Sequence, residues 1–220
     1  IGDWSSDVCS SDLHWPSSMA EDRSRQLVAI MFADLVGYTA LMQGDEVDAH
    51  AQREKHRAIL GSAVRRHRGE VLQYYGDGTL SIFSSAVEAV ECAVALQLEL
   101  TDASLIPLRI GIHTGDIVHD SDGVFGDGVN VASRIESLSA PGGVLISGKV
   151  FDEIKNHSSL SAVLMGDVRL KKVEYRLSVF AINNDGISVP TQAEVRAKAE
   201  RGGEGKFWPA EKPAVGEASA

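Results

Sequence analysis

The sequence has 220 residues, which allows one domain with a substantial core, or one domain plus tails. Its hydrophobic content of 44% is typical of a soluble globular protein, and its formal net charge of −10 argues against sequence-independent binding to nucleic acid. Because the chain is acidic, any triphosphate ligand has to be held locally by metal ions and a few Lys or Arg side chains. The 2 cysteines provide neither a disulfide framework nor a metal cluster, and no apolar run reaches transmembrane length, so the cytoplasm is the expected location.

Residues 1–18 are rich in Ser and Asp and show no helical or strand period. They lack the basic start and the apolar run of a secretory signal peptide. Met19, which a polar segment follows, resembles a natural initiation point. We therefore expect residues 1–18 to be an extraneous or disordered leader.

A short apolar run, Val28–Ala33, predicts a buried strand that ends at Asp34 and continues into a Gly-containing turn that ends at Thr39. A carboxylate at the mouth of a buried strand is costly to desolvate unless a cation holds it. The backbone amides of a turn at the start of a helix form a cradle for phosphate. The stretch therefore suggests a metal-bound polyphosphate, and the alternative is that Asp34 only caps the next helix.

Residues 45–68 predict a long helix with an acidic start and a basic end, whose apolar face carries Val47, Leu60 and Val64. We interpret the basic end as a solvated helix terminus rather than a phosphate-binding patch. Residues 71–83 then read as a hairpin turning at Gly-Asp-Gly. Asp77 in that turn could be a simple turn residue. If the hairpin lies beside the strand ending at Asp34, however, two carboxylates meet at one sheet end. Cations such as Mg²⁺ seek oxygen ligands of this kind and share them with substrate phosphates.

Residues 86–100 show a helical stripe that we expect to face the core, made of Val87, Val90, Val94 and Leu98. Residues 108–113 predict a strand, and Gly115 is expected to begin a turn. His113 in this strand is expected to be structural. Four polar residues follow in a predicted loop, where irregular spacing indicates solvated turn residues rather than a metal site. They are Asp116, His119, Asp120 and Asp122.

Residues 125–136 predict a helix on which Asn130 and Arg134 lie four residues apart on one face. An Arg fork beside an amide suits an oxyanion and a sugar oxygen, whereas the alternative is an Arg in a salt bridge on a solvated helix. A strand at 144–147, a short helix at 150–154 and strands at 162–170 and 175–182 follow. From about Asn184 the composition turns to Pro, Gly, Glu and Ala, which predicts that residues 185–220 form a disordered tail.

Five of these stretches, in this order, resemble the catalytic domain of class III adenylate/guanylate cyclases, in particular the bacterial soluble type. The resemblance extends from about Arg25 to about Ile182. The five stretches are Phe32–Thr39, Gly76–Gly78 with Phe83, Arg109–Gly115, Val129–Glu136 and Pro141–Ser147.

The alternation of strands and helices predicts an α+β fold, a mixed sheet with helices on one face. The resemblance implies a ferredoxin-like βαββαβ core with extra αβ elements and a catalytic domain over residues 19–184. It also implies a homodimer in which the metal-binding carboxylates and the Asn/Arg pair of each site come from different subunits, so that two equivalent sites form. The implied substrate is a nucleoside triphosphate.

By the same resemblance, Asp34 and Asp77 bridge two Mg²⁺ or Mn²⁺ ions, and the Leu35 carbonyl is a further ligand. Arg134 would stabilise charge on the α-phosphate and Asn130 would orient the ribose. Lys171 matches the phosphate-binding lysine of the family, with Lys172 as the alternative. The residues expected to bind substrate are Val36, Gly37, Tyr38, Thr39, Gln73, Gly76, Gly123 and Lys171.

Two positions depart from the family members that use ATP. Gln73 stands where they carry Lys, and Gly123, next to Asp122, stands where they carry Asp or Thr. Gln can both donate and accept hydrogen bonds, and Gly has no side chain, so this pair does not specify the base. ATP is the expected substrate, and a cyclase for GTP, UTP or CTP is the first alternative.

The second alternative is a nucleotide-binding or dimerisation module without catalysis. The retained Asp34, Asp77, Asn130 and Arg134 favour an active enzyme over such a module. The chain lacks the Gly-Gly-Asp-Glu-Phe turn of the diguanylate cyclases.

Overall fold

The computed structural model describes residues 25–103, 105–120, 123–170, 173, 175–201 and 205–209. The expected leader and the predictions for Asp122, Lys171 and Lys172 lie outside these residues. The first elements in chain order are β1 (Arg25–Leu35), α1 (Tyr38–Gly44), α2 (Glu46–Arg66), β2 (Glu70–Tyr75), β3 (Gly78–Phe83), α3 (Ala86–Asp102) and β4 (Leu108–Asp120). The later elements are β5 (Gly123–Phe125), α4 (Asp127–Leu138), β6 (Val144–Ser147), α5 (Gly148–Ile154), β7 (Ala162–Leu170), β8 (Leu177–Ile182), α6 (Gln192–Arg201) and β9 (Gly205–Pro209).

The strands of the described chain form one sheet in the order β2-β3-β1-β4-β6-β8-β7-β9, with β5 paired to β4. In the first four strands of this order, β2-β3-β1-β4, each strand is antiparallel to its neighbours. With the helices between them, they make the βαββαβ arrangement of a ferredoxin-like core. The predicted α+β fold is therefore confirmed, and β6 extends the core by pairing parallel to β4.

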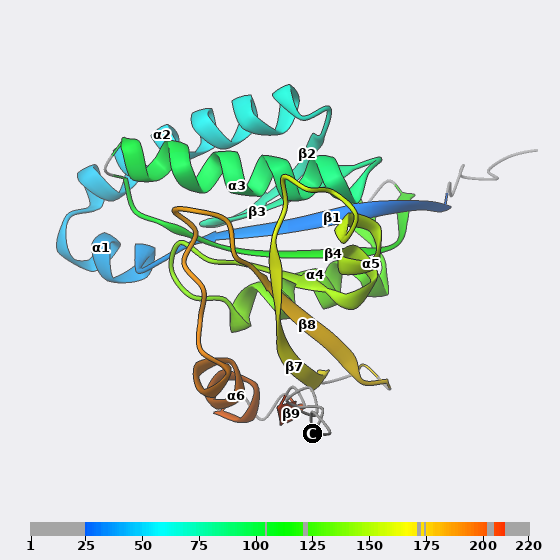
Figure 1. Ribbon diagram of the computed structural model, residues 1–220. Helices are drawn as coiled ribbons and strands as arrows, with labels where there is room; N and C mark the ends of the chain where they lie inside the picture. Colours follow the sequence, from blue (N-terminus) through cyan, green and yellow to red (C-terminus); the bar gives the residue numbers. More distant parts are fainter. Residues whose placement is uncertain are drawn as a thin grey trace, which may run out of the picture.

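Helices cover both faces of this sheet rather than the one face that the sequence predicted. In Figure 1, α2 and α3 lie on one side of β1 and β4, and α4 lies on the other. Alternate residues of β1 serve the two sides, since Met31 packs in the core under α2 and α3 while Ile30 packs in the cluster under α4. Asp34 follows the parity of Ile30 and therefore belongs to the α4 side.

The buried faces of α2 and α3 match the predicted stripes in part, because Leu60, Val64 and Val90 are buried in the core. Val47 is 81% exposed and Leu98 is 37% exposed, whereas small residues such as Ala89, Cys92 and Ala93 are fully buried. Because α3 is apolar on most of its circumference, the helical period alone does not indicate which side faces the sheet. Packing selects the alanine-rich side, which allows close approach.

Strand β4 is longer than predicted, because Gly115 does not begin a turn. The strand pairs with β1 along its length, with Gly115 opposite Val28 and Val118 opposite Arg25. A Cβ at Gly115 would lie 3.0 Å from the Cα of Gly128, so the glycine is needed where α4 crosses the strand. Asp116 accordingly lies on a strand and not in a loop.

The segment predicted to be a disordered tail contains the helix α6 instead. Val195 and Ala199 are buried in a cluster with residues of α4, β6, β7 and β8. Thr191 and Glu194 close the start of the helix by hydrogen bonds in both directions. Few apolar residues are needed for this packing, which explains why composition alone predicted disorder. Within the described residues, no helix combines the length and hydrophobicity of a membrane-spanning segment.

Candidate active site

Asp34 lies at the end of β1 between the two neighbouring strands of the core. Its Cα partners are Gly78 of β3 and Arg109 of β4. The side chain of Asp34 is only 18% exposed and forms an ion pair with the Arg109 guanidinium. The strand therefore places a carboxylate at the sheet end together with a cation, as the desolvation argument requires.

Asp77 reaches the same place through the β2–β3 hairpin, because it directly precedes Gly78, the partner of Asp34. Gly76 takes φ +63° at the first position of the two-residue turn, a conformation that favours glycine. Arg57 of α2 donates a hydrogen bond of 3.2 Å to the Gly76 carbonyl and so ties the turn to the helix layer. The register thus confirms the predicted hairpin beside β1.

The two carboxyl groups influence each other electrostatically. Partial burial raises the pKa of Asp77, and the nearby negative charge of Asp34 raises this pKa further. Two carboxylates in repulsive proximity form a donor set that fits divalent cations with oxygen ligands. Across the described residues, no group of three or more His, Cys, Asp or Glu side chains could hold a metal ion, so further ligands would have to come from the backbone or from substrate phosphates.

Arg109 and Glu136 belong to this cluster, although sequence reasoning did not assign them to it. The Arg109 Nε lies 2.9 Å from Glu136 Oε1 on α4, while its Nη2 contacts Asp34. Burial raises the pKa of Glu136 to about 7, and the charges of Asp34 and Asp77 act in the same direction against the opposing effect of Arg109. Arg109 is the second residue of the predicted strand 108–113, and only the antiparallel register with β1 shows that it faces Asp34.

The turn after β1, which the sequence predicts to be a phosphate cradle, differs from that prediction at one amide. Gly37 adopts φ +76° at the start of α1. The Val36 N–H donates to the Pro107 carbonyl at 3.3 Å, so it is already engaged and does not join the predicted cradle. The Tyr38 side chain is buried in the core, so any contact of Tyr38 with phosphate would have to be made by its backbone amide.

Asn130 and Arg134 lie one turn apart on α4, as predicted, but they face away from Asp34 of the same chain. The sheet-facing side of α4 is marked by Gly111, where an added Cβ would lie 2.5 Å from the Ala132 carbonyl oxygen. Residues two positions apart on a helix point about 200° apart. Asn130 and Arg134 are each two positions from Ala132, so their Cα–Cβ bonds project from the opposite side of the helix. Asn130 is exposed, whereas Arg134 is half-buried and its Nη1 atom is buried.

The positions expected to read the base lie on two different edges. Gln73 is exposed on β2, and its Oε1 accepts a hydrogen bond of 2.9 Å from the Tyr75 hydroxyl. Gly123 begins β5, opposite Asp120 at the end of β4. Lys171 lies outside the described residues.

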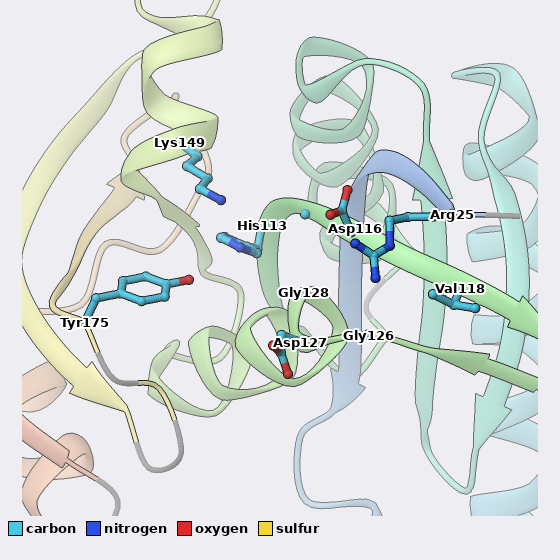
Figure 2. A pocket seen from close by; sticks show the side chains of 10 residues that line it. Arg25, His113, Asp116, Val118, Gly126, Asp127, Gly128, Lys149 and Tyr175 are labelled. Carbon is cyan, nitrogen blue, oxygen red and sulfur yellow. The ribbon is translucent and has the colours of Figure 1, made fainter. Parts of the chain in front are cut away.

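A cavity of about 440 Å³ opens at the other end of β1 and β4. Figure 2 shows His113, Lys149 and Tyr175 pointing toward one another across it. His113 is 2% exposed, and its Nδ1 lies 2.9 Å from the Ser147 hydroxyl. Burial, with help from the Lys149 charge, lowers the pKa of His113 to about 4, so the imidazole is neutral at pH 7. Neither Asp34 nor any other residue assigned to metal or substrate lines this cavity.

Comparisons with known proteins identify similar domains. The sequence model of the adenylate and guanylate cyclase catalytic domain matches residues 20–184. The chain is 41% identical over 162 residues to "Putative adenylate cyclase 3" of Rhizobium meliloti (strain 1021), which covers 70% of this chain and 28% of that protein. It is 31% identical over 159 residues to "Adenylate cyclase 1" of the same strain, covering 60% of this chain and 24% of that protein.

Among solved structures, the chain is similar to an adenylate/guanylate cyclase/hydrolase from Silicibacter pomeroyi. That match has a TM-score of 0.66 and 31% sequence identity, and it covers 74% of this chain and 99% of the other. The chain spans only about a quarter of the length of the two curated relatives, 28% and 24%. The helix α6 lies beyond the residues that the domain model matches.

Proposed function

Because this chain belongs to the class III adenylate/guanylate cyclase family, we propose that it converts a nucleoside triphosphate into the 3′,5′-cyclic monophosphate and pyrophosphate. The observation that carries the proposal is the juxtaposition of Asp34 and Asp77, which the β1–β3 register brings to one sheet end. A solvated turn has no need for a second, partly buried carboxylate next to the first. A site for cation-bound phosphates does need it.

In the reaction that we propose, the 3′-oxygen of the ribose attacks the α-phosphorus. A new P–O3′ bond forms, the bond from the α-phosphorus to the bridging oxygen of pyrophosphate breaks, and the 3′-hydroxyl proton passes to solvent. Such transfers require positioning and charge neutralisation more than covalent participation by the protein.

Asp34, Asp77 and the Leu35 carbonyl are the groups that would hold a pair of Mg²⁺ or Mn²⁺ ions. Ions in this position lower the pKa of the attacking hydroxyl and neutralise the β- and γ-phosphates. The amides of Gly37, Tyr38 and Thr39 are placed to receive phosphate oxygens at the start of α1.

The remaining groups come from a second copy of the chain in this proposal. Asn130 and Arg134 face away from Asp34 of their own subunit, which supports a homodimer in which each subunit completes the site of the other. The partner's Arg134 stabilises the charge that builds on the α-phosphate, and the partner's Asn130 orients the ribose. Lys171 remains the proposed phosphate lysine.

ATP is the expected substrate, and the names of the two curated relatives support that choice. With its oxygen engaged by Tyr75, Gln73 offers its amide N–H groups to the base. Such donors suit a ring nitrogen of adenine, and they also suit a carbonyl oxygen of guanine or a pyrimidine. The usual Lys and Asp pair would discriminate more strongly.

The test is to incubate the full chain with Mn²⁺ and each of the four ribonucleoside triphosphates and to identify products by mass spectrometry. A cyclic monophosphate from one or more bases is expected. Nucleotide binding without any cyclic product would contradict the proposal and indicate a binding module.

The shared site is tested by mixing two inactive variants, Asp34→Asn and Arg134→Ala. In random mixing half of the dimers are mixed, and each mixed dimer has one intact site, so about a quarter of wild-type activity is expected to return. If no activity returns although mixed dimers form, the site is not shared between subunits.

A further inference from the structure

We propose that Arg109 is a resident counterion of the metal site, a positioning residue that neutralises Asp34 before metal ions bind and transfers to Glu136 when they arrive. This inference rests on the proposed function of Asp34 as a metal ligand, and it assigns roles to two residues outside the family-derived set of site residues. Arg109 thereby sets how readily the empty site accepts a divalent cation.

The guanidinium of Arg109 lies between two carboxylates that are both shielded from solvent. The side chains of Asp34 and Glu136 are 18% and 6% exposed. Arg109 uses Nη2 toward Asp34 and Nε, 2.9 Å away, toward Glu136. The Nε–Oε1 approach is an ion pair without hydrogen-bond geometry, and both atoms are buried without a hydrogen-bond partner in the part of the chain that the structure describes. Glu136 Oε1 is therefore an unused acceptor that a small shift of the guanidinium away from Asp34 would engage.

A metal ion and Arg109 compete for the same carboxylate. The Nη2 contact engages one of the two Asp34 oxygens, and a cation that binds there would lie next to the positive charge of the guanidinium. A metal cation and the Arg109 guanidinium on the same carboxylate would repel each other strongly in a partly buried site. Metal binding at Asp34 therefore requires that Arg109 withdraw.

Glu136 is fixed where it can receive the withdrawn guanidinium. An added Cβ at Gly111 of β4 would lie 2.2 Å from the Glu136 backbone nitrogen, so α4 and β4 are in contact at this point. Lys198 of α6 also acts on Glu136 by its charge, and Lys198 itself donates a hydrogen bond to the Ser139 carbonyl at the end of α4. Since Glu136 is buried, it is stabilised by a cation whether or not metal is bound.

The two ends of the network predict effects of opposite sign on metal affinity. Mn²⁺ binding is measured by electron paramagnetic resonance on the full chain without nucleotide, so the readout does not depend on turnover. Arg109→Met removes the competitor and is expected to tighten Mn²⁺ binding about three- to tenfold. Glu136→Gln removes the negative charge of the alternative partner, keeps Arg109 on Asp34, and is expected to weaken binding by a similar factor.

The double variant Arg109→Met/Glu136→Gln separates the relay from general electrostatics. Because Glu136 acts through Arg109, the Glu136→Gln effect is expected to disappear in the Arg109→Met background. Lys149→Met, which removes a cation that lines the His113 cavity, is the matched control and is expected to leave Mn²⁺ affinity unchanged. A merely structural role for the network would weaken binding in both single variants, in step with a loss of thermal stability.

The proposal is overturned if Arg109→Met weakens Mn²⁺ binding or leaves it unchanged. Should Arg109→Met fail to fold, Glu136→Gln decides alone, and unchanged or tighter binding in that variant overturns the relay. Asp34→Asn and Asp77→Asn separate this failure from failure of the proposed function. If these two variants bind Mn²⁺ as tightly as the wild type does, the assignment of the metal site is wrong. If they lose Mn²⁺ binding, but Arg109→Met and Glu136→Gln do not change the Mn²⁺ affinity in opposite directions, only the relay is wrong.

Discussion

Burial changes the pKa of side chains in opposite directions in two regions of the β1–β4 pair. At the Asp34 end, partly buried carboxylates are interleaved with a guanidinium, and burial raises the pKa of both Asp77 and Glu136. Toward the other end, four residues or about 14 Å further along β4, His113 is held beside the Ser147 hydroxyl and burial lowers its pKa to about 4. The Asp34 region contains carboxylates that cations stabilise, whereas the His113 region contains an imidazole that stays neutral.

This difference separates a reactive end from a structural one. A further cation stabilises a cluster of ionised groups strongly, because the negative charge of each carboxylate is only partly neutralised by Arg109. A neutral imidazole bonded to a serine has little to gain from an added charge. Changes at the Asp34 end are therefore expected to alter turnover, and changes at the His113 end to alter stability.

The largest effect is expected from Asp34→Asn and Asp77→Asn. Each removes a proposed metal ligand, so kcat with saturating Mn²⁺ is expected to fall by about 100-fold or more, since even outer-shell changes cost up to about that much. Asp116→Asn, an exposed carboxylate at the other end of the sheet, is the control and is expected to keep wild-type kcat. Near-wild-type turnover in Asp34→Asn would remove the distinction between the two ends.

The pH dependence of stability is the next largest effect, and Glu136 is expected to make the protein less stable as the pH rises. The pKa of Glu136 is raised from 4.5 to about 7, so its contribution to stability is present below pH 4.5 and is lost as pH rises through 7. The loss amounts to about 3 kcal/mol. In Glu136→Gln this loss is expected to be absent when the free energy of unfolding is measured by urea titration from pH 4.5 to 8. A wild-type slope in this variant would show that Glu136 does not titrate in the folded state.

His113 gives the opposite sign over an overlapping range. Burial lowers the pKa of His113 from 6.5 to about 4. Between these pH values the unfolded chain binds a proton at His113 and the folded chain does not, so the free energy of unfolding falls as the pH drops from 6.5 toward 4. The fall is again about 3 kcal/mol. His113→Asn is expected to be less stable at pH 7 but to lose this slope, and Glu136→Gln is expected to show it more steeply than the wild type. If His113→Asn keeps the wild-type slope, another group is the one that titrates.

The sequence contains enough to predict that Asp34 and Asp77 meet, because a strand, a short turn and a hairpin have few ways to pair. The register between β1 and β4 cannot be predicted from the sequence, and this register places Arg109 beside Asp34. Gly115 was misread for a related reason, since a glycine under a crossing helix and a glycine in a turn look alike in sequence.

The helix α6 was missed because only two of its side chains, Val195 and Ala199, are buried. Composition detects large apolar faces, whereas a short helix can be held by a narrow contact. For the same reason, the approach of Lys198 to Glu136 was beyond sequence reasoning, because it depends on where that narrow contact places the helix.

The smallest predicted effect tests the structural end alone. Ser147→Ala removes the hydroxyl that contacts His113 and that also accepts a hydrogen bond of 3.5 Å from the Val150 amide at the start of α5. Loss of one buried hydrogen bond and one helix cap is expected to lower the free energy of unfolding by about 1–2 kcal/mol. Because Ser147 is far from Asp34, kcat is expected to stay within twofold of the wild type, as for Ser62→Ala on α2, the matched control. A large loss of turnover in Ser147→Ala without loss of stability would mean that the two ends are coupled, and that His113 serves the reaction rather than the fold.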